Sequence, residues 1–295
     1  MAIDLERPGL DGLNEAVGAL REWQAEGVAW QLHPGDLGWF WRSGAEATAA
    51  AVRIWRRDGR ILAVGLLDGA DLLRLTTAPD ARRDAELARR LTEDVLAPGR
   101  GVLPPGEVSI EAPRDALLQE LLPGHGWHTG EPWTPLSRDL TEPVKAPDLR
   151  VETIGPDDCH IWADVMRGAF DGSTFTPEKW HTMATGAPYA DARYLVGYDD
   201  QGDAVAAVAV WSAGPGRPGV LEPMGVHRDH RGYGHGRAIT LAAAAALQAL
   251  GASSAGVNTP SSNVAAVATY ESSGFRRLPE VRDLTRAASA SPILR

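Results

Sequence analysis

Apolar and polar positions alternate along the second half of the chain in a way that predicts strands and helices in turn. The segments 193–198 and 204–211 alternate like strands, and the turn residues Asp-Asp-Gln-Gly-Asp between them predict a hairpin. The Ala-rich run Ala238–Leu250 has high helix propensity and ends at Gly251, a favourable residue just after a helix. The other predicted elements are strand Leu149–Ile154, helix Pro156–Phe170, helix Thr176–Thr185, strand Val220–Val226, strand Ala255–Thr259, helix Asn263–Ser272 and a closing strand from Phe275. This order predicts an α/β domain with a mixed central sheet flanked by helices.

The segment TEPVKAP (141–147) interrupts the periodicity. Its two prolines remove backbone donors, so the segment is predicted to be a linker. A chain of 295 residues is long enough for two domains. We therefore expect one domain over residues 1–140 and a second over residues 148–295.

The first half contains a faded copy of the second. Residues 72–95 resemble residues 220–243, with Arg82 opposite Arg231, 149 positions later. Residues 108–128 resemble the segment 256–276, with Gly126-Trp127 opposite Gly274-Phe275, 148 positions later. Two matches at nearly one offset indicate a tandem duplication.

The two copies differ where the second carries its candidate chemistry. Ala85 and Leu87 stand where the second copy has Gly234 and Gly236, and Arg74 stands where it has Glu222. Asn263 and Tyr270 correspond to Asp115 and to Leu121 or Leu122. The first copy is therefore not expected to bind the same ligand.

The segment Arg231–Gly236 joins a predicted strand to a predicted helix. Small residues there let backbone N–H groups converge on an anion, and the helix dipole adds positive charge. Arg228, Arg231 and Arg237 can donate charge-assisted hydrogen bonds to phosphate. A pyrophosphate fits this pattern, and a glycine-rich turn that only tightens the connection is the alternative.

The pattern Arg231-x-x-Gly234-x-Gly236, together with Asn263, Ala266, Tyr270 and Gly274-Phe275, resembles the GNAT superfamily of acyl-CoA-dependent N-acyltransferases. The resemblance covers residues 148–285. It implies tandem GNAT domains of α/β fold, with residues 1–140 a degenerate copy, and acetyl-CoA as cofactor. A worn copy beside an intact one is also similar to the layout of mycothiol synthase, although no residue here specifies that enzyme's substrate.

The resemblance further implies where the cofactor lies. In the family the strand before the phosphate loop carries a bulge and splays from its neighbour, and Pro223 fits such an irregularity. The exposed strand edge pairs with the pantetheine arm, and one of its amides polarises the thioester carbonyl. The residues expected to contact the cofactor are Met224, Gly225, Val226, Arg231, Gly232, Tyr233, Gly234, His235, Gly236, Arg237, Asn263 and Ala266. Asn263 is also the expected N-cap of the helix that it begins.

Two residues are candidates for proton transfer. By the resemblance, Tyr270 protonates the departing thiolate and Glu222 accepts the proton of the amine. The alternatives are a core tyrosine at a helix end and a structural, ion-paired glutamate. His227 is a rival base. Cys159 and His160 form no dyad, because adjacent residues of a helix point in different directions.

Seven of the ten tryptophans lie in the first half, where packing is their simplest role. Trp39-Phe40-Trp41 is an alternative wall for an acceptor cleft. We expect the first half to shape the acceptor pocket and to stabilise its partner.

The composition limits the partners. A net charge of −10 argues against nucleic acid, and it is compatible with a cationic amine or simply with solubility. No apolar run is long enough for a membrane span, and no signal peptide or metal site is predicted. The single Cys159 excludes an internal disulfide and fits a cytoplasmic location. An oligomer is possible.

The function expected from these observations is transfer of an acetyl group from acetyl-CoA to a primary amine of a small molecule. A non-catalytic acetyl-CoA-binding sensor is the alternative. A Rossmann dinucleotide domain is disfavoured, because its glycine loop follows the first strand, whereas this loop follows the fourth predicted strand of its half.

Overall fold

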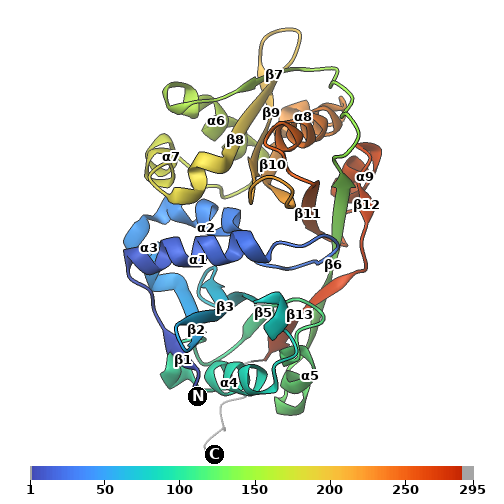
Figure 1. Cartoon of the computed structure of the whole chain (residues 1–295). Coiled ribbons are helices and arrows are strands. Elements are labelled where there is room, and N and C mark those ends of the chain that lie inside the picture. Colours follow the sequence, from blue (N-terminus) through green and yellow to red (C-terminus); the bar gives the residue numbers. More distant parts are fainter. Residues whose placement is uncertain (1, 288–295) are drawn as a thin grey trace, which may run out of the picture.

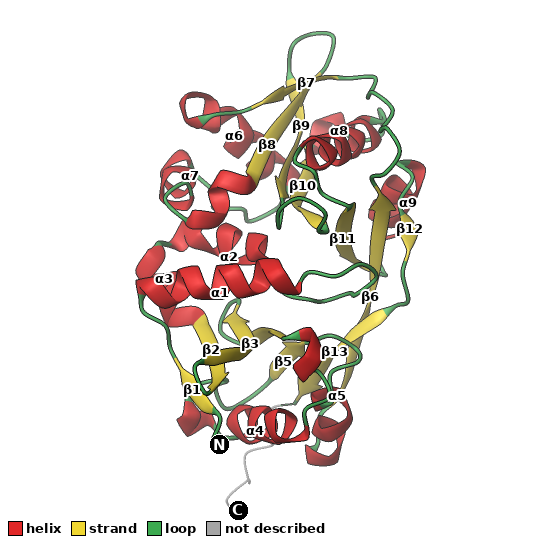
Figure 2. Cartoon of the chain, viewed as in Figure 1, coloured by secondary structure: helices red, strands yellow, loops and turns green. Residues whose placement is uncertain are grey.

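The computed structural model describes residues 2–287 and contains two halves of similar element order, one above the other in Figures 1 and 2. The first half contains β1 (Asp4–Glu6), α1 (Leu10–Trp23), α2 (Pro34–Phe40), α3 (Ala45–Ala51), β2 (Val52–Arg57), β3 (Arg60–Leu67), β4 (Leu72–Thr77), α4 (Ala85–Leu96), β5 (Val108–Glu111), α5 (Leu118–Leu121) and β6 (His128–Asp139). The second contains β7 (Arg150–Thr153), α6 (Cys159–Ala169), α7 (Pro177–Met183), β8 (Ala192–Tyr198), β9 (Ala204–Trp211), β10 (Gly219–Val226), α8 (His235–Ala249), β11 (Ser254–Pro260), α9 (Val264–Ser272), β12 (Arg276–Arg277) and β13 (Val281–Arg286). The predicted α/β class and the order of elements in the second half are confirmed, with ends shifted by a few residues.

The strands of both halves form one mixed sheet. Its order is β1-β2-β3-β4-β5-β13-β6-β11-β10-β9-β8-β7, and β12 pairs with β6 beside this path. β4 runs parallel to β5, and β10 runs parallel to β11, so the same pairing recurs in both copies. Separate apolar cores lie in the two halves, the first around Trp55 and the second around Ile239 and Trp162.

The two halves exchange their last strands. β6 belongs to the first half by sequence, yet its residues 133–139 pair antiparallel with β11 of the second. β13 is the last strand of the second half, yet it lies between β5 and β6, with Leu284 opposite Ile110 and packed in the first core. Figure 1 shows β6 passing from one half to the other. Strands from before the predicted linker at residues 141–147 therefore pair with strands from after it, at both β6 and β13.

The segment after β6 has no regular structure over residues 141–147, as the prolines predict. It is held against α8 by Gln248, whose Nε2 donates to the Leu140 carbonyl at 2.7 Å and to the Glu142 carbonyl at 2.8 Å. Within residues 2–287, no helix has the length and apolar character that a membrane span requires.

Helix α2 attaches the first half to the second beside β10. A Cβ atom at Gly35 or at Gly38 would overlap the indole ring of Trp211, so two glycines one turn apart let the ring lie against the helix backbone. His33 caps the same helix, because its Nδ1 accepts the Gly35 N–H at 2.9 Å. Its Nε2 lies 3.2 Å from the Pro218 carbonyl of the second half, and burial lowers its pKa to about 4. The ring is therefore neutral at pH 7, with Nε2–H donating to Pro218.

We predict that residues 148–295 do not fold when expressed alone. The fragment lacks β6, so β11 loses a partner along seven register positions and β13 loses both neighbours. Circular dichroism and size-exclusion chromatography, with the full chain as control, should show an unfolded or aggregated fragment. A monomeric fragment that unfolds cooperatively would contradict the importance of the exchange.

We also predict that Gly38→Ala destabilises the protein by about 1–3 kcal/mol, because the added methyl overpacks the contact with Trp211. Gly18→Ala in α1 is the matched control, since a Cβ there meets nothing within 4 Å and should stabilise the helix by about 0.5–1 kcal/mol. Urea denaturation of both variants measures the difference. Equal effects of the two substitutions would show that the contact is not tight.

Candidate active site

Strand β10 is irregular at the point where the sequence predicts it. Leu221 of β10 lies opposite Val210 of β9, and Met224 of β10 lies opposite Val208 of β9. Two residues of β10, Glu222 and Pro223, therefore face a single residue of β9, which makes a bulge of one extra residue. On the other side, β10 pairs with β11 only at Gly219 and Val220. The rest of β10 separates from β11 and leaves an open backbone edge. The expected bulge and splay are both present.

A cavity of about 400 Å³ lies along this open edge. The second half lines it with β10 from Gly219 to Met224, with β11 and with α9. The first half lines it with the segment Gln24–His33 and with residues of α2, β4 and β5. The expectation that the first half shapes this pocket agrees with that lining. Glu222, Met224, Asn263, Ala266 and Tyr270 are the sequence-predicted site residues that line it.

The phosphate loop lies at the start of α8. Gly232 and Gly234 have positive φ angles of 88° and 86°, which favour glycine. Gly234 is the N-cap residue, and no side chain caps the helix, so its first N–H groups are available to an anion. Gly236 allows α9 to approach, because a Cβ there would lie 3.1 Å from Thr269. Tyr233 is 76% exposed at the tip of the loop.

The arginines near the loop make contacts that the sequence did not predict. Arg231 Nη2 donates to the Ala169 carbonyl at 2.7 Å, and Arg237 Nε donates to the Ser272 carbonyl at 3.0 Å. Arg228 pairs with Asp171 at 2.9 Å. These side chains brace the loop against α6 and α9, so the backbone is the principal anion donor that the geometry offers.

Two other candidate residues, Gly225 and His227, take packing positions, and Cys159 forms no dyad with His160, as expected. Gly225 is buried against α6, since a Cβ there would lie 2.6 Å from that of Ala169. The ring of His227 fills the space over Gly168, and this histidine is not among the cavity-lining residues. Cys159 lies 3.8 Å from His181 Nε2 rather than beside His160.

The corresponding helix of the first half is closed to anions. Asp84 caps α4, with Oδ1 accepting the Leu87 N–H at 2.9 Å. Arg57 pairs with this carboxylate at 2.8 Å. β4 also has no register shift against β3. The first copy therefore lacks the bulge and the free helix N-terminus of the second.

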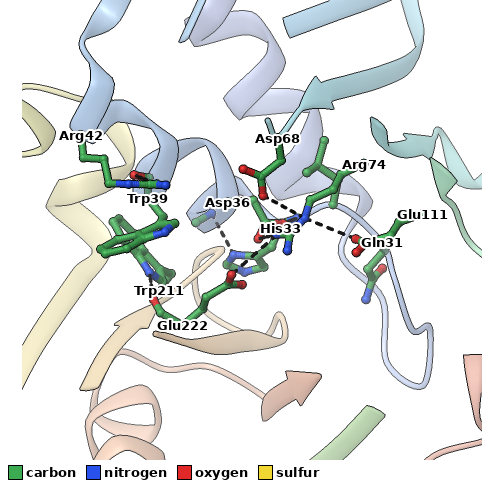
Figure 3. Close-up of polar contacts among 12 residues, drawn as sticks. Gln31, His33, Asp36, Trp39, Arg42, Asp68, Arg74, Glu111, Trp211 and Glu222 are labelled. Atoms are coloured by element: carbon green, nitrogen blue, oxygen red, sulfur yellow. Dashed lines mark hydrogen bonds and ion pairs between the residues drawn. The ribbon is translucent and has the colours of Figure 1, made fainter. Parts of the chain in front are cut away.

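Glu222 lies in a group of charged residues contributed mainly by the first half (Figure 3). Trp211 holds its backbone, with Nε1 donating to the Glu222 carbonyl at 2.8 Å. Its side chain is 40% exposed, and this surface opens into the cavity that it lines. Arg74 is the centre of the group. Its four ion pairs are to Asp36 at 3.0 Å, Asp68 at 3.3 Å, Glu111 at 3.3 Å and Glu222 at 3.7 Å.

One guanidinium cannot offset four neighbouring carboxylates. Burial raises the pKa of Glu222 to about 7 against the lowering effect of Arg74, and the charges of Asp36, Glu111 and Asp68 raise it as well. Burial likewise raises the pKa of Glu111 to about 7. Glu222 can therefore exchange a proton near neutral pH, as a general base requires.

Tyr270 and Asn263 lie two turns apart on or beside α9. Burial, and then the charge of Glu222, raise the pKa of Tyr270, so its hydroxyl stays protonated at neutral pH and can donate a proton. The predicted cap at Asn263 is confirmed, because its side chain accepts the Ala266 N–H at 3.2 Å.

The sequence missed Asp36, Asp68 and Glu111 because nothing in their local patterns connects them. Only the duplication gave a signal, since it placed Arg74 at the position equivalent to Glu222.

The alternative that Trp39-Phe40-Trp41 forms a wall of the acceptor cleft is wrong. Trp39 stacks on Phe175 with ring centroids 5.3 Å apart, Trp41 is buried in the first core, and neither lines the cavity.

Comparisons with known proteins agree with this geometry. The model of the acetyltransferase (GNAT) family matches residues 160–275. No curated protein sequence gives a significant match.

Solved structures extend the likeness to the whole chain. A tandem GNAT protein from the clavulanic acid biosynthesis pathway has a TM-score of 0.62 and 16% identity, covering 98% of this chain and 100% of that chain. A GCN5-related N-acetyltransferase from Sphaerobacter thermophilus has a TM-score of 0.58 and 17% identity, covering 98% and 96%. A GNAT-family acetyltransferase from Colwellia psychrerythraea has a TM-score of 0.58 and 15% identity, covering 97% and 98%. The C-terminal half of this chain thus matches the acetyltransferase (GNAT) family model over residues 160–275, and the chain as a whole has the fold of tandem GNAT proteins.

Proposed function

We propose that this protein transfers the acetyl group of acetyl-CoA to a primary amine of a small molecule. The observation that carries the proposal is that Glu222 and Tyr270 line one cavity at the open edge of β10. One group has a pKa near neutrality, and the other remains protonated there. A base and an acid with such different pKa values suit a reaction that removes one proton and supplies another.

The residues present fit acetyl-CoA. The uncapped N-terminus of α8 and the positive-φ glycines at 232 and 234 suit a pyrophosphate, and the unpaired edge of Met224–Val226 suits an amide-containing arm. The cofactor would supply an activated acetyl thioester. Arg231, Tyr233, His235, Gly236, Arg237, Asn263 and Ala266 remain proposed contacts on the loop and on α9.

The chain's own residues would handle the protons of a direct transfer. Glu222 would accept a proton from the attacking amine, directly or through water, as the new C–N bond forms. A backbone amide of Met224–Val226 would stabilise negative charge on the carbonyl oxygen. Tyr270 would donate its hydroxyl proton to the sulfur as the C–S bond breaks.

The charge of the cavity favours an amine acceptor. Asp36, Glu111 and Glu222 all line it, and Arg74 is the one guanidinium among its lining residues. This balance attracts a protonated amine and raises its local concentration; the ammonium group would lose one proton to solvent before its nitrogen attacks, and Glu222 would accept the second. Because the cavity is enclosed between the two halves, it favours a small molecule over a nucleic acid as acceptor. A cytoplasmic location stays a prediction.

We predict one acetyl-CoA site per chain, in the second half. Titration calorimetry should show one site in the wild type and none in a Gly234→Trp, Gly236→Trp variant, because the indoles block the helix N-terminus. Ala85→Trp, at the exposed equivalent position in the first half, is the matched control and should leave binding unchanged. Loss of binding in the control, or two sites in the wild type, would contradict the assignment.

We predict that Glu222→Gln and Tyr270→Phe each reduce thiol release with a panel of small primary amines by about 10²–10⁴-fold while acetyl-CoA still binds. Because Glu222 acts deprotonated and its pKa is raised to about 7, kcat/KM of the wild type should fall as pH drops below about 7. This fall should be absent from the residual activity of Glu222→Gln. Binding without any thiol release in the wild type would favour the sensor instead.

A further inference from the structure

We propose that Arg74 of the first half is a positioning residue that holds the Glu222 side chain in place as a carboxylate. The inference rests on the proposed function, since it concerns the base of that reaction. It gives the degenerate copy a direct part in the active site of the other copy.

Arg74 contacts the Glu222 side chain directly. Arg74 lies on β4 with its Cα opposite that of Glu111 on β5, and its side chain is 21% exposed. Its Nη1 atom is 3.0 Å from Asp36 Oδ1 and 3.7 Å from Glu222 Oε1. One guanidinium nitrogen thus lies between a carboxylate of the first half and the candidate base of the second (Figure 3).

The duplication relates Arg74 to Glu222. Arg74 and Glu222 stand at equivalent positions of the two copies, 148 residues apart. Arg74 is on β4, the strand before α4, and Glu222 is on β10, the strand before α8. The structure brings these two equivalent positions together across the cavity. A carboxylate at position 74 would oppose Glu222 with a like charge, whereas an arginine there attracts it.

Glu222 depends mainly on Arg74 for its ionisation. Among the described residues, Arg74 is the only basic group within 4 Å of its carboxylate. The charges of Asp36 on α2, Asp68 after β3 and Glu111 on β5 all oppose ionisation of Glu222. Of the other groups near it, His33 is neutral and Tyr270 is a phenol. Arg42 is a second, more distant cation: burial lowers its pKa and the charges of Asp68 and Glu222 oppose that lowering, but its guanidinium lies 4.4 Å above the Trp39 ring and makes no ion pair with Glu222.

Removal of Arg74 therefore leaves Glu222 facing three carboxylates, with no cation among residues 2–287 within ion-pair distance. Such a group takes up a proton at neutral pH, and a protonated Glu222 cannot accept the proton of an amine. An arginine that only joined the two halves would change stability without changing the titration of Glu222. The titration therefore separates positioning from mere structural support.

The test follows the Glu222 carboxyl by ¹³C NMR in protein labelled at the glutamate side-chain carboxyl. Glu222→Gln and Glu111→Gln assign the two signals that titrate near neutrality. Arg74→Met should raise the pKa of Glu222 by about one unit or more. Arg74→Lys should leave it near the wild-type value, and Asp68→Asn should lower it.

Kinetics provide the second measurement. With any primary amine that the wild type acetylates, the acidic limb of kcat/KM should move to higher pH in Arg74→Met by the same shift as the NMR titration. The KM for acetyl-CoA should not change, because Arg74 lies away from the phosphate loop. If Arg74→Met does not fold, the charge-balanced variant Arg74→Met, Asp68→Asn replaces it, and the pKa should still rise, since Arg74 affects Glu222 more than Asp68 does.

The outcomes separate the two proposals. An unchanged Glu222 titration in the folded Arg74→Met or double variant of an active enzyme would overturn the role of Arg74 alone. Failure of the wild type to release thiol with every amine would overturn the proposed function, whatever the titration shows. A matched shift in titration and in pH profile, restored by Arg74→Lys, would support both.

Discussion

The exchange of β6 and β13 is the constraint on which the rest of the structure depends. Because β6 pairs with β11 and β13 lies between β5 and β6, the backbone hydrogen bonds of each half include a strand of the other. Opening the interface between the halves would break sheet hydrogen bonds as well as side-chain contacts. The cavity between the halves therefore keeps a fixed geometry, as a site assembled from both halves requires.

The bulge in β10 is the second constraint, and it corresponds to a one-residue change in the offset between the two copies of the sequence. The two copies are offset by 148 positions at Glu222 and by 149 at Arg231, and one extra residue in β10 lies between these points. That residue re-aims the strand and frees its edge from β11. A single insertion thus distinguishes a strand that can receive an extended ligand from β4, which retains its regular pairing.

The sequence predicted what local patterns determine. Strand alternation, the Ala-rich helix, the glycine loop and the Asn263 cap all depend on residues close together in the chain, and the structure contains them. The strand exchange was not predicted, because nothing in residues 128–139 distinguishes a partner in one half from a partner in the other. The group around Arg74 was missed for a similar reason: Asp36, Asp68 and Glu111 come from three separate elements that only the fold brings together.

The two copies show that one helix N-terminus cannot serve two purposes. In α4 the free N–H groups are satisfied by Asp84, which gains a stable cap and an ion pair with Arg57 but leaves no place for a phosphate. In α8 the same groups are uncapped at Gly234, which costs local stability and leaves them to an anion from outside the chain. Once α4 is closed, the neighbouring position 74 no longer has to serve a cofactor, and a cation there can act on the other copy. The closed helix and Arg74 are then two consequences of the same specialisation, in which one copy gives up its ligand and supports the chemistry of the other.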